Sequence, residues 1–325
     1  MYGTKDKDMI VKLNNLEQSF LKAQHDKMLK NPIFSPVAKI FKENISEIKK
    51  GRQIQDDSYA RHRLKKINTL CISCHSQLPR KQYSKIANQY NAITDKYIRR
   101  NHDKAMLSYF LRDYSASVQY FKKEFGETSN QDVSVVKTIL KIYVENLEDE
   151  EKAAKYLQSI SINKKTSNEI KNLSKGWIQG LRQPFPQKND TKSIKKLIAR
   201  VNNVKDNFNI NSSSALEAFR LKRTFNNYIA RNPNTKFMPE ILYSLGILTD
   251  RSNDLYLYSL GEMYLKKCVV NFPKSKIAKD CYTAYEDSVI FGFTGSSGTN
   301  IPSDVKKELR TLRSIVKNKK SKTRS

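Results

Sequence analysis

Helical periodicity is the feature of this sequence that most limits its fold. Apolar residues recur at steps of three and four over helix-length blocks. In the first block, from Lys7 to about Lys30, they are Ile10, Leu13, Leu16, Phe20, Leu21, Met28 and Leu29. Only 10 Gly and 9 Pro interrupt the 325 residues, and the Asn-Gly and Asp-Gly pairs of tight β-hairpins are absent. The sequence therefore predicts an all-α protein.

The first 103 residues are expected to form a helical bundle. Four amphipathic helices are predicted there, at about 7–30, 36–49, 59–71 and 80–97. The first stops at Asn31-Pro32, and the second is expected to end at Gly51. Four helices in so short a stretch can share a single core, which is the arrangement of a bundle.

Pairs of predicted helices with similar sequence patterns follow, from about residue 105 to residue 290. The clearest pair is "YLKKCVVNFPKSKIAKDCYTAYE", which resembles the tetratricopeptide repeat. Pro273 occupies the expected turn, and Ala278 and Ala284 are small residues where the two helices approach. The resemblance implies an array of α-helical hairpins (TPR-like), although the pairs do not keep a regular period of about 34 residues.

Stretches rich in Pro, Gly and polar residues divide the second part of the chain into segments. Helical hairpins are predicted at 104–182, a linker rich in Pro and polar residues at 183–191, and TPR-like repeats at 192–300. The stretch 292–305, "GFTGSSGTNIPSDV", is dense in Gly and Ser and is expected to be a non-helical turn. Residues 301–325 are expected to hold a final helix and a basic tail, "VKNKKSKTRS", that is disordered.

The charge of the chain is strongly positive. Sixty basic residues against 32 acidic ones give a net charge of +28, which favours attraction to anionic surfaces. The lysines are scattered along the whole chain and form no stripe that would match a groove of nucleic acid, so no nucleic-acid partner is predicted. No apolar run approaches the roughly 20 residues of a membrane-spanning helix, and no signal peptide can be read at the start.

The short motif "CISCH" is the part of the sequence that indicates a cofactor. Cys71 and Cys74 lie one helical turn apart, so their thiols can reach the two vinyl groups of a haem, and His75 can then ligate the iron. At these three residues the chain resembles a c-type cytochrome with one haem. The resemblance implies one covalent haem c, with Cys71 and Cys74 as thioether anchors and His75 as the proximal axial ligand.

Three other interpretations of the motif were weighed. A structural zinc site needs two further close ligands, but Cys268 and Cys281 lie far away along the chain and no His is near them. A thioredoxin-like redox pair needs a βαβ setting, which a helical sequence does not provide. The third alternative is a chance occurrence of the five residues.

The ligand on the far side of the iron is left open. His25 and Met28 lie one turn apart near the C-terminal end of the first predicted helix, at the level where the third helix delivers Cys71. They are the first two candidates; His102 and Met106 are further ones. His62 lies nine residues before Cys71, about 13 Å along the same helix, and is a poor candidate. A five-coordinate iron is the remaining alternative.

Haem attachment of this kind takes place outside the bacterial cytoplasmic membrane in the family that the motif resembles. We therefore expect an exported, periplasmic protein, and expect that Met1 is not the native start of the chain. An oxidising compartment also favours a disulfide between Cys268 and Cys281, which flank the turn at Pro273. Two buried free cysteines are the alternative.

Two functions are carried forward. In the first, the chain is an exported electron-transfer or haem-sensing protein whose helical-repeat scaffold docks it on a redox partner with an acidic surface, alone or within a membrane-associated complex. In the second, it is a TPR-like adaptor that binds a protein or peptide, and the haem is structural. No catalytic residues are predicted, because no nucleophile with a neighbouring base and no convergent carboxylates can be read.

Overall fold

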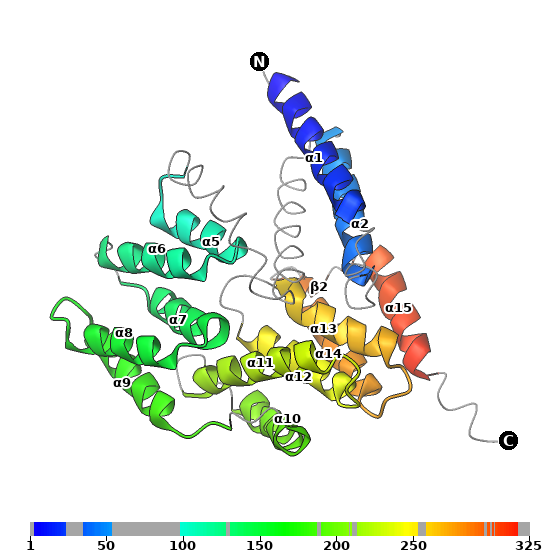
Figure 1. The fold of residues 1–325 in the computed structure, drawn as a ribbon. Coiled ribbons are helices and arrows are strands. Elements are labelled where there is room, and N and C mark those ends of the chain that lie inside the picture. Colours follow the sequence, from blue (N-terminus) through cyan, green and yellow to red (C-terminus); the bar gives the residue numbers. More distant parts are fainter. Residues whose placement is uncertain are drawn as a thin grey trace. The chain divides into compact units, whose positions relative to one another are not determined.

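The protein is known here from a computed structural model. The structure describes residues 3–23, 35–53, 98–127, 131–186, 190–207, 209, 213–252, 258–295, 298–299, 301 and 303–317 (Figure 1). The chain divides into two compact units, Met1–Arg80 and Lys81–Ser325. The domain boundaries predicted from the sequence do not coincide with this division, since the first predicted domain extends to residue 103, and they stay predictions.

The fold is all-α, as predicted. The described residues form thirteen α-helices, one short π-helical segment and one ribbon of two very short strands. In the part of the chain that the structure describes, no helix is long and apolar enough to cross a membrane.

Two helices of the first unit are described, α1 (Gly3–Ala23) and α2 (Ser35–Gln53), and they pack against each other. Phe41, Ile45 and Ile48 are buried on α2, and Lys49 pairs with Glu17 at 2.5 Å. The expectation that the second helix ends at Gly51 was wrong, because the helix continues to Gln53. A glycine costs a helix only about 1 kcal/mol relative to alanine and does not by itself stop it. The third and fourth predicted helices lie outside the described residues.

The second unit begins with helices that pack as neighbours along the chain. They are α5 (Asn101–Phe110), α6 (Tyr114–Glu127), α7 (Val133–Lys141), the π-helical segment η2 (Ile142–Leu147), α8 (Glu150–Ile162) and α9 (Asn168–Arg182). α5 packs on α6 and α8 packs on α9. Short polar residues start three of these helices, because Asp132, Asp149 and Ser167 each accept a hydrogen bond from a backbone N–H of the first turn.

The helices in the rest of the unit share one hydrophobic core. This part of the chain consists of α10 (Thr191–Asp206), α11 (Ser213–Arg231), α12 (Met238–Arg251), α13 (Tyr258–Asn271), α14 (Ala278–Gly292), the ribbon of β1 (Thr294–Gly295) with β2 (Gly298–Thr299), and α15 (Ser303–Lys317). α9 ends at Arg182 and α10 starts at Thr191. Pro273 lies in the turn between α13 and α14, and Ala278 is buried at the start of α14. The tetratricopeptide resemblance itself stays a prediction.

The Gly- and Ser-rich stretch 292–305 is partly helical, so the expectation that none of it is helical was wrong at its two ends. Gly292 is the last residue of α14, and α15 begins at Ser303, a residue type that favours helix starts. Between them, Thr294 pairs with Thr299 in the antiparallel ribbon, and Gly298 has a φ of +97° that suits glycine.

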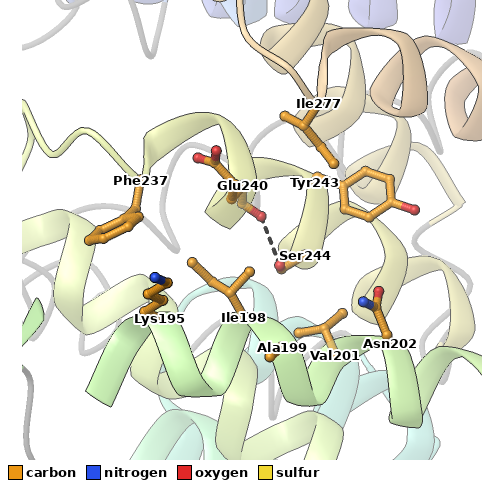
Figure 2. Close-up of a pocket in the computed structure, with 10 residues that line it drawn as sticks. All are labelled: Lys195, Ile198, Ala199, Val201, Asn202, Phe237, Glu240, Tyr243, Ser244 and Ile277. Atoms are coloured by element: carbon orange, nitrogen blue, oxygen red, sulfur yellow. Dashed lines mark hydrogen bonds between the residues drawn. The ribbon is translucent and has the colours of Figure 1, made fainter. Parts of the chain in front are cut away.

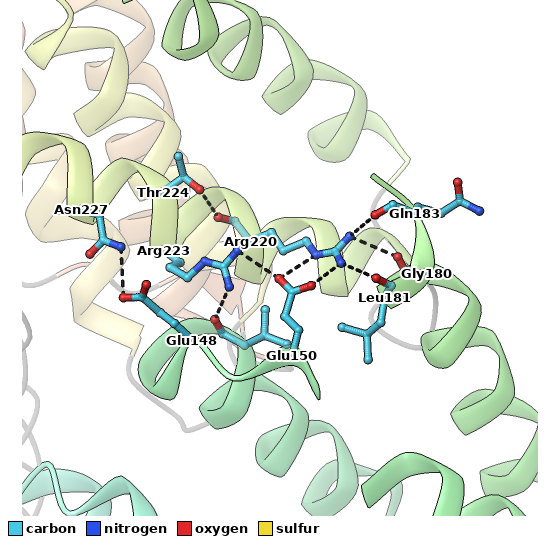
Figure 3. A network of polar contacts seen from close by, with 10 residues as sticks. Glu148, Glu150, Gly180, Leu181, Gln183, Arg220, Arg223, Thr224 and Asn227 are labelled. Atoms are coloured by element: carbon cyan, nitrogen blue, oxygen red, sulfur yellow. Dashed lines mark hydrogen bonds and ion pairs between the residues drawn. The ribbon is translucent and has the colours of Figure 1, made fainter. Parts of the chain in front are cut away.

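Arg220 of α11 joins three helices through one buried guanidinium (Figure 3). Its Nε and one terminal nitrogen bind the two carboxylate oxygens of Glu150, at the start of α8, at 3.1 and 2.5 Å. The guanidinium also donates to the backbone carbonyls of Gly180, Leu181 and Gln183 at the end of α9, at 2.8 to 3.3 Å. The side chain of Arg220 is only 6% exposed. It therefore neutralises a helix N-terminal carboxylate and satisfies carbonyls that a helix end leaves unpaired.

Two further side chains of α11 bind the segment that precedes α8 (Figure 3). Arg223 donates to the carbonyl of Val144 at 3.1 Å and pairs with Glu150 at 3.0 Å. Asn227 donates to the carboxylate of Glu148 at 3.1 Å, and Glu148 itself holds the left-handed backbone conformation that ends η2. α11 thus attaches the backbone of η2 and the end of α9 to the hydrophobic core that α10 to α15 share.

Removing the Arg220 guanidinium is predicted to destabilise the fold strongly. Arg220→Met removes the side-chain donor from the carbonyls at the end of α9 and one of the two cations that face Glu150, so the free energy of unfolding should fall by about 3 kcal/mol. The matched control is Lys155→Met, which breaks the ion pair of Lys155 with Glu151, whose side chains are 72% and 78% exposed. That change should cost less than about 0.5 kcal/mol. Urea unfolding measures both; equal effects would contradict the role given to Arg220.

α12 and α13 pack closely because glycines face each other where they meet. A Cβ atom on Gly261 would lie 3.0 Å from the carbonyl oxygen of Gly246 and 3.3 Å from the backbone nitrogen of Asp250. Both are backbone atoms, which cannot move aside without separating the helices.

A pair of glycine substitutions tests this packing. Gly261→Ala should lower the free energy of unfolding by about 1 to 3 kcal/mol, because the helices must move apart. Gly176→Ala, in the interior of α9, adds a Cβ that meets nothing within 4 Å, so it should stabilise the protein by up to about 1 kcal/mol. Thermal unfolding of the two variants should therefore shift in opposite directions; shifts in the same direction would contradict the close packing.

Candidate functional site

The predicted haem site falls in parts of the chain that the structure does not describe. Cys71, Cys74 and His75 all lie within 54–97, as does His62. His25 and Met28, the first two candidates for the distal ligand, lie within 24–34. Haem attachment stays a prediction from the sequence.

His102 and Met106 are the candidate ligands that the structure describes, and they lie one turn apart on α5. The Nδ1 atom of His102 lies 3.0 Å from a carboxylate oxygen of Glu124, and its ring packs edge-on against Phe121. Because an ionised carboxylate only accepts hydrogen bonds, Nδ1 carries the proton, and in the neutral ring Nε2 keeps its lone pair. This tautomer is able to ligate a metal. The role of His102 at a haem iron stays a prediction.

The predicted disulfide between Cys268 and Cys281 is formed. The two Sγ atoms are 2.07 Å apart and the Cα atoms 6.2 Å apart, and both side chains are fully buried. The bond joins α13 to α14 across the turn that contains Pro273.

A hollow of about 340 Å³ opens between α10 and α12 (Figure 2). Apolar side chains form most of its lining, with Ile198 on α10, Phe237 before α12 and Ile277 before α14. Polar groups flank them: Lys195, Asn202, Glu240, Tyr243 and Ser244. One carboxylate oxygen of Glu240 is buried and makes no hydrogen bond.

A second, larger hollow of about 950 Å³ continues from the first. Its lining includes Tyr243, which also lines the first hollow, and Lys205 donates to the Tyr243 hydroxyl at 3.3 Å. The rest comes from α12, α14 and the residues after α10: Asn209, Ile247, Asp250, Arg251, Asp280, Thr283, Ala284, Asp287, Ser288 and Phe291. Because the two hollows share Tyr243, they are together called the α10–α12–α14 groove after the helices that line them.

A buried lysine, glutamate and serine meet where η2 contacts α11 and α12. The Nζ atom of Lys222 lies 3.0 Å from a carboxylate oxygen of Glu145 and donates to the hydroxyl of Ser252 at 2.8 Å. Lysine beside serine can activate a nucleophile only when the amine is neutral. Here the amine pairs with a carboxylate, and both Lys222 and Ser252 are buried, so the arrangement suits a structural ion pair rather than catalysis.

No protein-family model matches this chain, and neither a curated protein nor a solved structure matches it. In the part of the chain that the structure describes, no three His, Cys, Asp or Glu side chains come together as metal ligands. The function must therefore be argued from the motif, the disulfide and the groove.

The groove and the buried charges were not found by sequence reasoning, although signals for both exist. Asp280 and Asp287 are two helical turns apart and so share one face, which is unusual in a chain this basic. Arg220 and Lys222 alternate with Phe219 and Leu221 in α11, so burial of this segment also buries the two cations, which then need acidic partners. The partners themselves, 70 residues away in the case of Glu150, could not be identified from the sequence.

The buried Lys267, which precedes Cys268 of the disulfide, should make the stability of the fold depend on pH. Burial lowers the pKa of the Lys267 amine from 10.5 to about 8, and the residue is 9% exposed. Below pH 8 the folded state carries a buried charge, and this cost disappears as the pH rises to about 10.5, because the unfolded chain then binds more protons. The contribution of Lys267 therefore raises stability between pH 8 and 10.5.

Lys267→Met should remove that dependence. The variant should be more stable than the parent at pH 7, and its advantage should shrink toward zero as the pH rises to 10.5. The neighbouring Lys266→Met loses an ion pair with Glu308 at 2.8 Å and should gain nothing at pH 7. Urea unfolding across the pH range measures both variants. An advantage of Lys267→Met that does not change with pH would contradict the buried charge.

Proposed function

We propose that this chain is an exported c-type cytochrome that serves electron transfer or haem-based sensing. The observation that carries the proposal is the "CISCH" motif, in which Cys71 and Cys74 would hold one haem c through thioether bonds and His75 would ligate the iron. The bound haem would supply a redox-active iron. The polypeptide would hold the haem and present a charged docking surface, and no catalytic residue is proposed.

The disulfide supports the proposed compartment. Structural disulfides persist in oxidising compartments such as the bacterial periplasm and are rare in the cytosol. The pair Cys268–Cys281 is buried near the turn of a helical hairpin, as a structural disulfide is. The same compartment is where the family that the motif resembles acquires its haem, so two independent features favour export.

The charge supports a redox partner with an acidic surface. A net charge of +28 would draw an acidic protein toward this chain, and an encounter of this kind weakens as salt is added. No nucleic-acid partner is proposed, and the proposed periplasmic location also separates the chain from DNA.

The alternative function is an adaptor with a TPR-like scaffold, in which the haem is structural. The observation that favours it is the α10–α12–α14 groove, which is long, partly apolar and lined by three helices. A groove of this kind suits an extended or helical segment of another protein.

Production of the exported protein together with a cytochrome c maturation system tests the main proposal. The purified chain should be red, show a Soret band, gain the mass of one haem and keep it through denaturing electrophoresis, because thioether bonds are covalent. Cys71→Ala with Cys74→Ala should abolish covalent attachment. The matched control, Cys268→Ala with Cys281→Ala, also removes two cysteines but should leave the haem in place. A colourless product with only the polypeptide mass, despite export, would refute the cytochrome.

The same preparation separates the two functions. Rapid and reversible reduction of the haem supports electron transfer, whereas partner binding that survives the loss of haem in Cys71→Ala supports the adaptor. Substitution of His25, Met28 or His102 then identifies a distal ligand, because loss of the sixth ligand converts a low-spin absorption spectrum to a high-spin one.

A further inference from the structure

We propose that the α10–α12–α14 groove binds a lysine- or arginine-rich segment of a partner protein that carries one large apolar anchor residue. The inference holds whether or not the chain carries haem. If the chain is an adaptor, the inference names the class of partner that its groove binds. It is drawn from the shape of the groove, its carboxylates and one exposed aromatic ring.

The first hollow suits an apolar anchor. Ile198, Phe237 and Ile277 surround a space of about 340 Å³, which is at the lower end of the range for ligand pockets and large enough for one leucine, methionine or phenylalanine side chain (Figure 2). Glu240 borders the same space with a buried carboxylate oxygen that has no hydrogen-bond partner. A cation beside the anchor would supply that partner.

The second hollow is lined with carboxylates. Asp280 and Asp287 lie two turns apart on α14, and Asp250 faces them from α12. The lining residues between the two aspartates of α14 are Thr283 and Ala284, whose side chains are small, so an incoming chain can approach the helix closely there.

The sign of the charge in the groove is opposite to that of the protein. The two hollows expose four carboxylates, Glu240, Asp250, Asp280 and Asp287, against three cations, Lys195, Lys205 and Arg251, while the whole chain has 60 basic and 32 acidic residues. The amine of Lys205 donates to the Tyr243 hydroxyl, and the carboxylate of Asp250 accepts a hydrogen bond from Ser288. The groove therefore favours a cationic occupant, whereas nucleic acid and anionic lipid would be drawn to the rest of the surface.

An exposed phenylalanine marks the far end of the groove. Phe291 is 79% exposed, although a buried phenylalanine would be worth about 2 to 3 kcal/mol of hydrophobic free energy. Its ring can cover the aliphatic part of a lysine or stack against an arginine. Ile247, which is almost buried, lies in the same hollow.

The length of the groove fits a short peptide. Asp280 and Phe291 are eleven residues apart on α14, which is about 16 Å at 1.5 Å per residue. An extended chain covers that distance in about five residues. The expected occupant is therefore an anchor residue followed by a few residues that place cations opposite Asp250, Asp280 and Asp287.

Fluorescence anisotropy with a labelled synthetic peptide tests the proposal on the full chain. The probe is a ten-residue peptide with one leucine followed by lysines at alternate positions, and two comparison peptides replace either the leucine by serine or the lysines by glutamate. The lysine peptide should bind, and its affinity should fall as salt is added. Each comparison peptide should bind at least about tenfold more weakly, which corresponds to about 1.4 kcal/mol.

Matched variants decide whether the groove is the site. Asp280→Asn with Asp287→Asn should weaken binding of the lysine peptide at least about tenfold. Glu151→Gln with Glu169→Gln changes the net charge equally at exposed positions outside the groove and should leave binding unchanged. Phe291→Ser should weaken binding without changing the unfolding midpoint, because its ring is exposed.

Three results would overturn the inference: no binding of the lysine peptide, equal binding of the glutamate peptide, or equal weakening by the two carboxylate pairs. The haem proposal can fail independently, because Cys71→Ala should leave peptide binding unchanged.

Discussion

The buried guanidinium of Arg220 is the interaction on which the second unit depends. Through it, α11 holds the start of α8 and the end of α9, while the apolar face of α11 belongs to the core of α10–α15. Arg223, Asn227 and Lys222 extend the same contact to η2. α11 thereby joins helices that are not its neighbours along the chain, and the helices that line the groove are packed against that same core.

Local sequence was sufficient to predict the helical class, the turn at Pro273 and the disulfide that spans it. These features depend on residues close together in the chain, such as Cys268 and Cys281, which are 13 residues apart. The groove and the Arg220 contacts could not be predicted, because they join residues far apart in the sequence, such as Glu150 and Arg220. The end of α2 was misplaced because one glycine is too weak a signal to stop a helix that packs well.

The haem motif and the groove are independent kinds of observation. The motif is a covalent signature of five contiguous residues, so its chemistry can be proposed without any knowledge of the fold. The groove exists only in the folded chain, where α12 and α14 bring their carboxylates together. One proposal concerns the iron and the other a peptide partner, and each can stand without the other.

The buried disulfide has a consequence for how such a chain could mature. Any disulfide other than Cys268–Cys281 would use Cys71 or Cys74 and so remove a thiol that haem attachment would need. Cys268 and Cys281 lie on a hairpin that folds locally, and once folded their sulfurs are sealed from solvent. If that hairpin closed early, Cys268 and Cys281 could no longer exchange disulfides with Cys71 and Cys74. Oxidation of the first pair would then keep the second pair reduced.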